Sequence, residues 1–142
     1  MPSAFQVKQY HPKSYYHVYN RGAQGVDIFR DGNDYWIFRK TARKLQTIFG
    51  VRIDTFTLLP NHYHLLPYQE KPRAISKFMH SLGLRYTLYF NRKYHKSGRL
   101  CEERYKAVHL PSAEDVERVR KYILDNPINK GYLNWKHVGR SI

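Results

Sequence analysis

The octapeptide LPNHYHLL, residues 59–66, decides how the rest of the chain is arranged. Its histidines, His62 and His64, are two positions apart, and side chains with that spacing share a face only on a β-strand. On a helix the pair would diverge by roughly 200°, which excludes a helical metal motif with histidines four apart. Pro60-Asn61 is typical of a turn that leads into the strand. Two interpretations follow: the imidazoles hold one metal ion, or they are surface histidines on a half-buried strand.

The composition indicates a single basic domain over residues 1–142, with residues 1–13 as a loose arm. Lysine and arginine number 25 against 11 acidic residues, so the net charge is +14 and the pI about 10.0. Such an excess favours a polyanionic partner, nucleic acid before membrane, because phosphate contacts release counterions. The 13 tyrosines can stack on unpaired bases, although most are expected in the core. The composition is also compatible with a protein that binds nucleic acid and catalyses no reaction.

The cysteine count and the hydropathy of the sequence bear on where in the cell the protein is located. The single cysteine, Cys101, excludes an intramolecular disulfide and a multi-cysteine zinc site. No apolar run is long enough for a membrane span, and no signal-peptide core follows Met1. We therefore expect a cytoplasmic, nucleoid-associated protein without a membrane partner.

Periodicity and breakers predict the order of elements. Strands are expected over residues 14–21, 51–58, from 62 onward and 105–110, with helices over about 33–49, 75–90 and 112–126. Asn33 or Asp34 is expected to cap the first helix, and Pro127 to end the last one. Val26, Ile28 and Phe29, in the loop over 22–32, are expected to fold onto the core. The order is that of an α+β, ferredoxin-like βαββαβ antiparallel sheet with helices on one face and an added C-terminal helix.

On the last predicted helix, Arg118, Tyr122 and Asn126 are spaced by four and therefore lie along one line. If this helix packs near His62 and His64, Asn126 can offer a carbonyl oxygen as a third metal ligand. Tyr122 would then stand one turn from the ion. A phenol is almost fully protonated at neutral pH, so a nucleophilic tyrosine needs a neighbouring cation or metal to stabilise its phenolate, or water to take its proton as it attacks. The alternative for Tyr122 is a partly buried residue whose hydroxyl meets the backbone.

Ordered motifs along the chain resemble the single-tyrosine HUH transposases, whose domain is IS200-like, and most closely the REP-associated tyrosine transposases. They begin with YHVYNRG at residues 16–22 and the LPNHYHLL octapeptide. The pattern continues with RYTLYFN at 85–91, SGRL at 97–100 and YILDNPINKG at 122–131. The match covers nearly the whole chain after residue 14. It departs from the common pattern at Cys101-Glu102-Glu103 and at Leu66-Pro67, which puts hairpin contacts in doubt.

The resemblance implies a metal-dependent DNA strand transferase that cleaves and rejoins single-stranded DNA beside hairpins. His62 and His64 would hold Mg²⁺ or Mn²⁺, with Asn126 as third ligand. Tyr122 would be the nucleophile that forms a 5′-phosphotyrosine and releases a 3′-hydroxyl. The expected DNA contacts are Arg85, Arg92, Lys93, Lys96 and Arg118.

Two other functions stay open. One is a domesticated binder of structured single-stranded DNA or RNA that no longer transposes. The other is a nicking enzyme of replication or conjugation, although such enzymes usually have longer chains. The sequence leaves a homodimer and a monomer equally possible.

Overall fold

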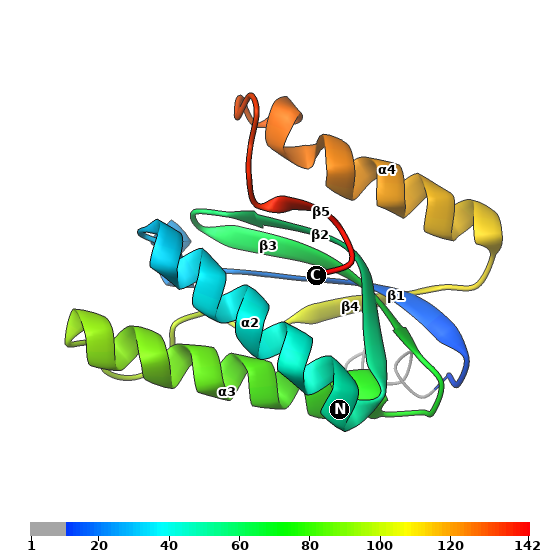
Figure 1. Ribbon diagram of the computed structural model, residues 1–142, viewed down its shortest axis with the longest axis horizontal. Coiled ribbons are helices and arrows are strands. Elements are labelled where there is room, and N and C mark those ends of the chain that lie inside the picture. The colour runs from blue at the N-terminus through cyan, green and yellow to red at the C-terminus, as the bar shows by residue number, and fades with distance from the viewer. Residues whose placement is uncertain (1–10) are drawn as a thin grey trace.

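The computed structural model describes residues 11–142, which form a five-stranded antiparallel sheet and three α-helices (Figure 1). The strands are adjacent in the order β4-β1-β3-β2-β5, so β3 lies in the middle of the sheet. The elements, in chain order, are β1 (Ser14–Arg21), a 3-10 turn η1 (Ala23–Gly25), α2 (Gly32–Phe49), β2 (Val51–Leu59), β3 (His62–Gln69), α3 (Ala74–Tyr94), β4 (Lys106–Leu110), α4 (Ala113–Asn129) and β5 (Val138–Arg140).

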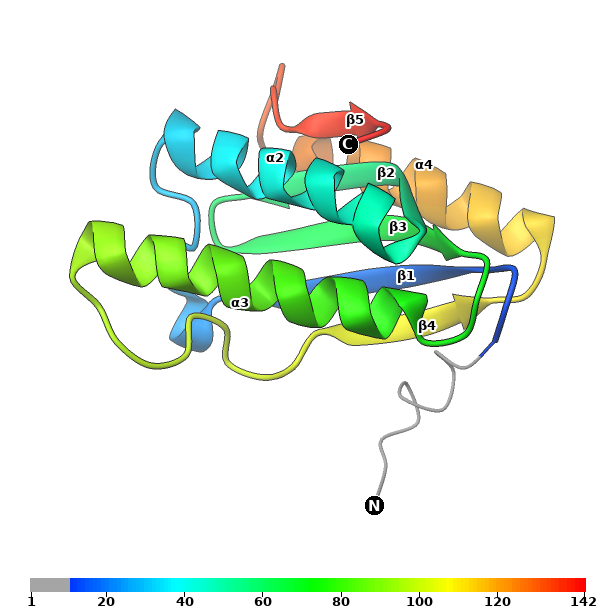
Figure 2. The ribbon, with the colours of Figure 1, turned by 60° about the horizontal axis from the view of Figure 1, so that its bottom comes forward.

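The helices divide between the two faces of the sheet (Figures 1 and 2). Helices α2 and α3 lie side by side on one face, as the sequence predicts, and the added helix α4 covers part of the other. The larger core lies between the sheet and the α2–α3 layer, where Phe38, Phe56, Tyr63 and Phe78 are buried. A small second core lies under α4 and consists of Leu66, Leu110, Val116, Val119 and Ile123. One face of the sheet therefore carries most of the core, and the other is available for polar residues.

Local signals explain the ends of α2. The N-cap is Asp31, whose carboxylate accepts a hydrogen bond from the backbone N–H of Asp34, so the predicted caps, Asn33 and Asp34, are wrong by two or three residues. At the other end Gly50 adopts a left-handed conformation with φ of 66°, which glycine reaches without steric conflict.

Helix α4 runs three residues further than the sequence predicts. Pro127 lies inside it, and the helix ends at Asn129 rather than Asn126. Proline lacks only its own N–H, and the following groups still find acceptors: Lys130 N–H donates to the carbonyl oxygens of Asn126 and Pro127. The proline is therefore tolerated in the last turn, and Asn126 keeps a helical neighbour on each side.

An extra residue in β2 shifts the alternation of its side chains. Ile53 pairs with Pro67 and Thr55 pairs with Leu66, which leaves Asp54 as the bulged residue. Because of this bulge, Ile53 and Phe56 both belong to the larger core, although they are three positions apart. The Asp54 carboxylate is buried and pairs with Arg120 of α4 at 2.9 Å, so the bulge anchors α4 to the sheet.

The structure also differs from the sequence-based expectations in one loop and in a fifth strand. Ile28 and Phe29 are buried as predicted, whereas Val26 is exposed, because it follows the 3-10 turn on the outside of the loop. Strand β5, which has only three residues, was not predicted from the sequence. Residues 1–10 of the expected arm lie outside the described residues, and Lys13 N–H donates to the carbonyl of Glu70. Within residues 11–142, none of the helices combines the length and the apolar character needed to cross a membrane.

Candidate active site

Strand β3 places both histidines of the octapeptide on the face that α4 covers. His64 pairs with Tyr19 of β1, and His62 pairs with Arg21, so the central strand presents them between two neighbours. Their ring centroids are 5.4 Å apart and nearly perpendicular. Tyr63, between them, points the other way and packs on Phe38 in the larger core. The period-two prediction for this strand is therefore confirmed.

Helix α4 brings Tyr122 and Asn126 to the same place. The Tyr122 ring centroid is 5.5 Å from that of His64, and 47% of the residue is exposed. Asn126, one turn further along, is 3% exposed. Val119 and Ile123 hold the helix on the sheet from its apolar side, while Tyr122 stands at its edge. The four-residue spacing thus lets one helix pack and present functional groups at once.

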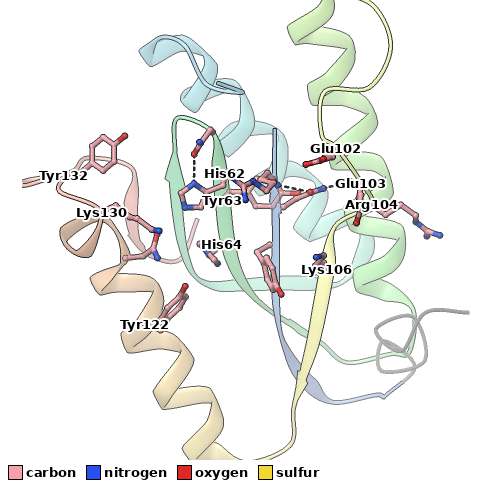
Figure 3. A pocket seen from close by; sticks show the side chains of 15 residues that line it. His62, Tyr63, His64, Glu102, Glu103, Arg104, Lys106, Tyr122, Lys130 and Tyr132 are labelled. Atoms are coloured by element: carbon pink, nitrogen blue, oxygen red, sulfur yellow. Dashed lines mark hydrogen bonds between the residues drawn. The ribbon is translucent and has the colours of Figure 1, made fainter. Parts of the chain in front are cut away.

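These side chains line a single open pocket of about 690 Å³ (Figure 3). Tyr122 and Lys130 reach in from α4, and Glu102, Glu103 and Arg104 lie on the opposite rim. The other lining residues are Tyr19, Asn20, Arg21, Asn61, His62, Tyr63, His64, Lys106, Asn126 and Tyr132. The pocket holds four cationic side chains against two carboxylates, which suits a phosphate-bearing ligand.

Burial keeps the imidazoles neutral. It lowers the pKa of His64 to about 3, with the nearby charges of His17, His62 and Lys130 acting in the same direction. The pKa of His62 is also lowered, first by burial and then by Lys130, while the side chain of Asn126 partly opposes the change. Neutral imidazole is the form that binds a metal ion.

The donor set at the pocket fits a divalent cation. Within residues 11–142 the structure has no cluster of three or more His, Cys, Asp or Glu side chains suited to a metal ion. The third donor must therefore come from another residue type. Oδ1 of Asn126 is buried and finds no hydrogen-bond partner in the described part of the chain. A buried polar atom without a partner destabilises the fold unless a ligand satisfies it, so His62, His64 and Asn126 together fit such an ion.

The five cationic residues expected to bind DNA are not gathered in one place. Arg118 lies beside Tyr122, in a neighbouring hollow of about 410 Å³. Arg85, Arg92 and Lys93 belong to α3, on the opposite face of the sheet, and Lys96 follows that helix. Lys93 is ion-paired to Asp31 at 2.7 Å and to buried Asp34 at 2.9 Å, as part of the packing of α3 on α2.

Sequence reasoning gave no role to three residues at the site. Lys130 continues the line of Tyr122 and Asn126 by one more step of four, a signal that the predicted helix end at Asn126 hid. Lys106 enters the pocket from β4. His17 lies on β1 with its ring 5.8 Å from that of Tyr122. Strand pairing brings His17 and Lys106 to the site, and local sequence does not specify that pairing.

Comparison with solved structures shows the same fold in several proteins. A REP-associated tyrosine transposase bound to a REP hairpin superimposes with a TM-score of 0.74 at 14% identity, over 91% of this chain and 78% of that one. A candidate transposase of Deinococcus radiodurans R1 gives 0.58 at 18% identity, over 80% and 91%. The tRNA(His) guanylyltransferase of Saccharomyces cerevisiae gives 0.55 at 13% identity, over 89% and 67%. The fold alone therefore accommodates different chemistries.

Sequence comparison distinguishes between these chemistries. No curated protein sequence matches the chain. Residues 10–126, however, match the profile of the family described as "Transposase IS200 like". That span includes both histidines of β3 and both Tyr122 and Asn126 of α4. The chain belongs to the IS200-like transposase family.

Proposed function

We propose that the protein is a metal-dependent DNA strand transferase that cleaves and rejoins single-stranded DNA beside hairpins, with Tyr122 as nucleophile. The observation that carries the proposal is the convergence of Tyr122 with His62, His64 and the buried, unpartnered Oδ1 of Asn126 on one cationic pocket. A ferredoxin-like sheet would serve as the rigid support for this site. The solved transposase with a TM-score of 0.74 is bound to a REP hairpin, which supports a hairpin-bearing substrate.

The position of Tyr122 suits attack on a strand that passes over the pocket. Its half-exposed ring stands at the rim, so a backbone phosphate can approach the hydroxyl without α4 moving away. Arg21, Lys106 and Lys130 line the same pocket and would hold the flanking phosphates. Positioning of this kind supplies much of the catalysis in phosphoryl transfer.

In the proposed cleavage step, one phosphorus–oxygen bond forms as another breaks. The Tyr122 oxygen bonds to phosphorus, the bond from phosphorus to the 3′-oxygen breaks, the phenol proton passes to water, and the leaving oxygen takes up a proton. When bound, Mg²⁺ or Mn²⁺ supplies neutralisation of the charge that develops on the non-bridging oxygens. His62 and His64 contribute neutral donors, and Asn126 contributes an uncharged oxygen. Because the phosphotyrosine retains the ester bond, a 3′-hydroxyl can reverse the step without ATP.

The test is incubation of the protein with a hairpin-bearing single strand and Mg²⁺, followed by denaturing electrophoresis. We expect an SDS-stable protein–DNA adduct that mass spectrometry assigns to Tyr122. Tyr122→Phe should lose both the adduct and cleavage while binding the strand normally. The matched control is Tyr132→Phe, because Tyr132 lines the same pocket. Cleavage by Tyr122→Phe, or an adduct on another tyrosine, would refute the assignment.

The net charge of +14 also favours a second candidate, a domesticated binder of structured single-stranded DNA or RNA. A binder needs cations but not an unpartnered buried amide beside two neutral imidazoles. The same incubation separates the two candidates, because a binder shifts the strand on a native gel and forms no adduct.

A further inference from the structure

The side chain of His17 contacts that of His64, one of the candidate metal ligands. It sits on β1, and its Nε2 is 3.0 Å from Nδ1 of His64, with the rings 28° from parallel. Its ring also contacts those of Tyr19 and Tyr122, at centroid distances of 5.0 Å and 5.8 Å. His17 lines the hollow beside the pocket rather than the pocket itself. It therefore contacts His64 through the Nδ1 edge of that ring without lining the pocket itself.

This contact decides which nitrogen of His64 is available to coordinate a metal ion. With Nδ1 engaged by His17, only Nε2 can reach a ligand in the pocket. A nitrogen that coordinates a metal must offer its lone pair, so the single proton of neutral His64 must sit on Nδ1. Nδ1–H then donates to Nε2 of His17. If the hydrogen bond ran in the other direction, His64 would carry its proton on Nε2 and could not coordinate.

His62 has the same arrangement with a different partner. Its Nδ1 is 2.7 Å from Oδ1 of Asn61, an oxygen that only accepts. The Asn61 amide is oriented by its own nitrogen, which donates to the carbonyl of Gly25 at 3.5 Å. His62 must therefore be the donor through Nδ1, so Nε2 is the nitrogen left to coordinate an ion in the pocket. Both histidines thus have Nδ1 tied to an outer residue.

We propose that His17 is a positioning residue that accepts the Nδ1–H of His64 and thereby holds Nε2 of His64 ready for a divalent cation. The proposal rests on the proposed function, because the cation is the one that strand transfer requires. Outer partners of this kind set both the tautomer and the ring orientation of metal-binding histidines, and their loss typically weakens metal binding about 10- to 100-fold. His17 needs to accept one hydrogen bond and does not need to touch DNA.

Two substitutions of His17 test separately its role as a hydrogen-bond acceptor and the packing of its ring. Gln places a carbonyl oxygen about where Nε2 of His17 lies, so His17→Gln should keep Mn²⁺ affinity close to that of the wild type. His17→Phe keeps a ring against Tyr122 but has no acceptor, and its Mn²⁺ affinity should fall about 10- to 100-fold. His109→Phe is the matched control, because His109 lies on the neighbouring strand β4 and its ring packs on those of His11 and Tyr16. Mn²⁺ binding is read by electron paramagnetic resonance, and folding by circular dichroism.

The tautomer itself is measurable without metal or DNA. Long-range ¹H–¹⁵N spectra of the wild type should show His64 protonated on Nδ1. Protonation on Nε2 would overturn the proposal, as would wild-type Mn²⁺ affinity in a folded His17→Phe. If His17→Phe does not fold, the wild-type spectrum and the His17→Gln affinity decide. Because the tautomer is read from the metal-free protein, its failure is distinguishable from failure of the cleavage assay, which tests the proposed function.

Discussion

Replacing Asp54 by Asn should destabilise the protein by about 2.5 kcal/mol. Burial alone would raise the pKa of this carboxyl, but hydrogen bonds from Arg120 and Thr55 and the charges of Arg120 and Arg140 lower it to about 2. A free aspartate ionises near pH 3.9, and each tenfold difference in proton affinity between the folded and unfolded states corresponds to about 1.4 kcal/mol of stability. Asn keeps an oxygen for the Thr55 hydroxyl, so the substitution removes the charge with little loss of packing.

The sign of the pH dependence follows from the lowered pKa. The folded state binds a proton less readily than the unfolded state, so the ion pairs stabilise the fold fully above about pH 4. That stabilisation is lost as the pH falls from about 4 to about 2. Urea unfolding of the wild type and Asp54→Asn should therefore differ by about 2.5 kcal/mol at pH 7, and by about half as much at pH 3. The melting temperature at pH 7 should fall by roughly 6 °C.

Asp125→Asn is the control for a generic loss of negative charge. Asp125 pairs with Lys121 on the outside of α4, where both side chains are well exposed. Exposed pairs four residues apart contribute only about 0.3–0.5 kcal/mol. The reasoning fails if Asp54→Asn is no more destabilising than this control, or if the difference between wild type and variant grows as the pH is lowered.

Three further outcomes are expected. His62→Ala and His64→Ala should each abolish cleavage while the protein stays folded, and EDTA should do the same to the wild type; full activity in both variants would remove the metal site. Affinity for single-stranded DNA should fall with salt at a log–log slope of about −3, since each of the four pocket cations contributes roughly 0.7; a slope near zero between ~50 and 200 mM would place the DNA elsewhere. Asn126→Ala should reduce cleavage less than His64→Ala, because water can replace one amide oxygen; equal losses would contradict this ranking.

The elements near the octapeptide could be predicted because their local signals agree. Alternation in β3, the apolar stripe of α3 and the Ser112 cap of α4 each have one interpretation. The predicted end of α4 was wrong because the rule for proline describes helix interiors, and Pro127 occupies the last turn. The only sign of the bulge in the sequence is one polar residue, Asp54, that breaks the side-chain pattern of β2. The role of Asp54 in anchoring α4 could therefore not be predicted.

The candidate site residues also differ in how far local sequence predicts their positions. That Tyr122 and Asn126 lie close together follows from helical spacing, and that His62 and His64 do so follows from strand spacing, because each pair lies on one element. His17 comes from another strand, and register between strands depends on the whole sheet rather than on neighbours in sequence. The resemblance to a family implied roles for the first four residues and none for His17, although His17 lies within the YHVYNRG motif.

The division of the sheet into two faces has a consequence for how such a protein can change over generations. The apolar face supports folding, so the polar face under α4 carries groups that weaken the fold, among them the unpartnered Oδ1 of Asn126 and the buried hydroxyl of Thr57. Selection for the proposed strand transfer would retain such groups, and its loss would let apolar replacements such as Asn126→Leu accumulate with a gain in stability. A descendant kept only as a binder would therefore become more stable as positions 62, 64 and 126 lose their polar character.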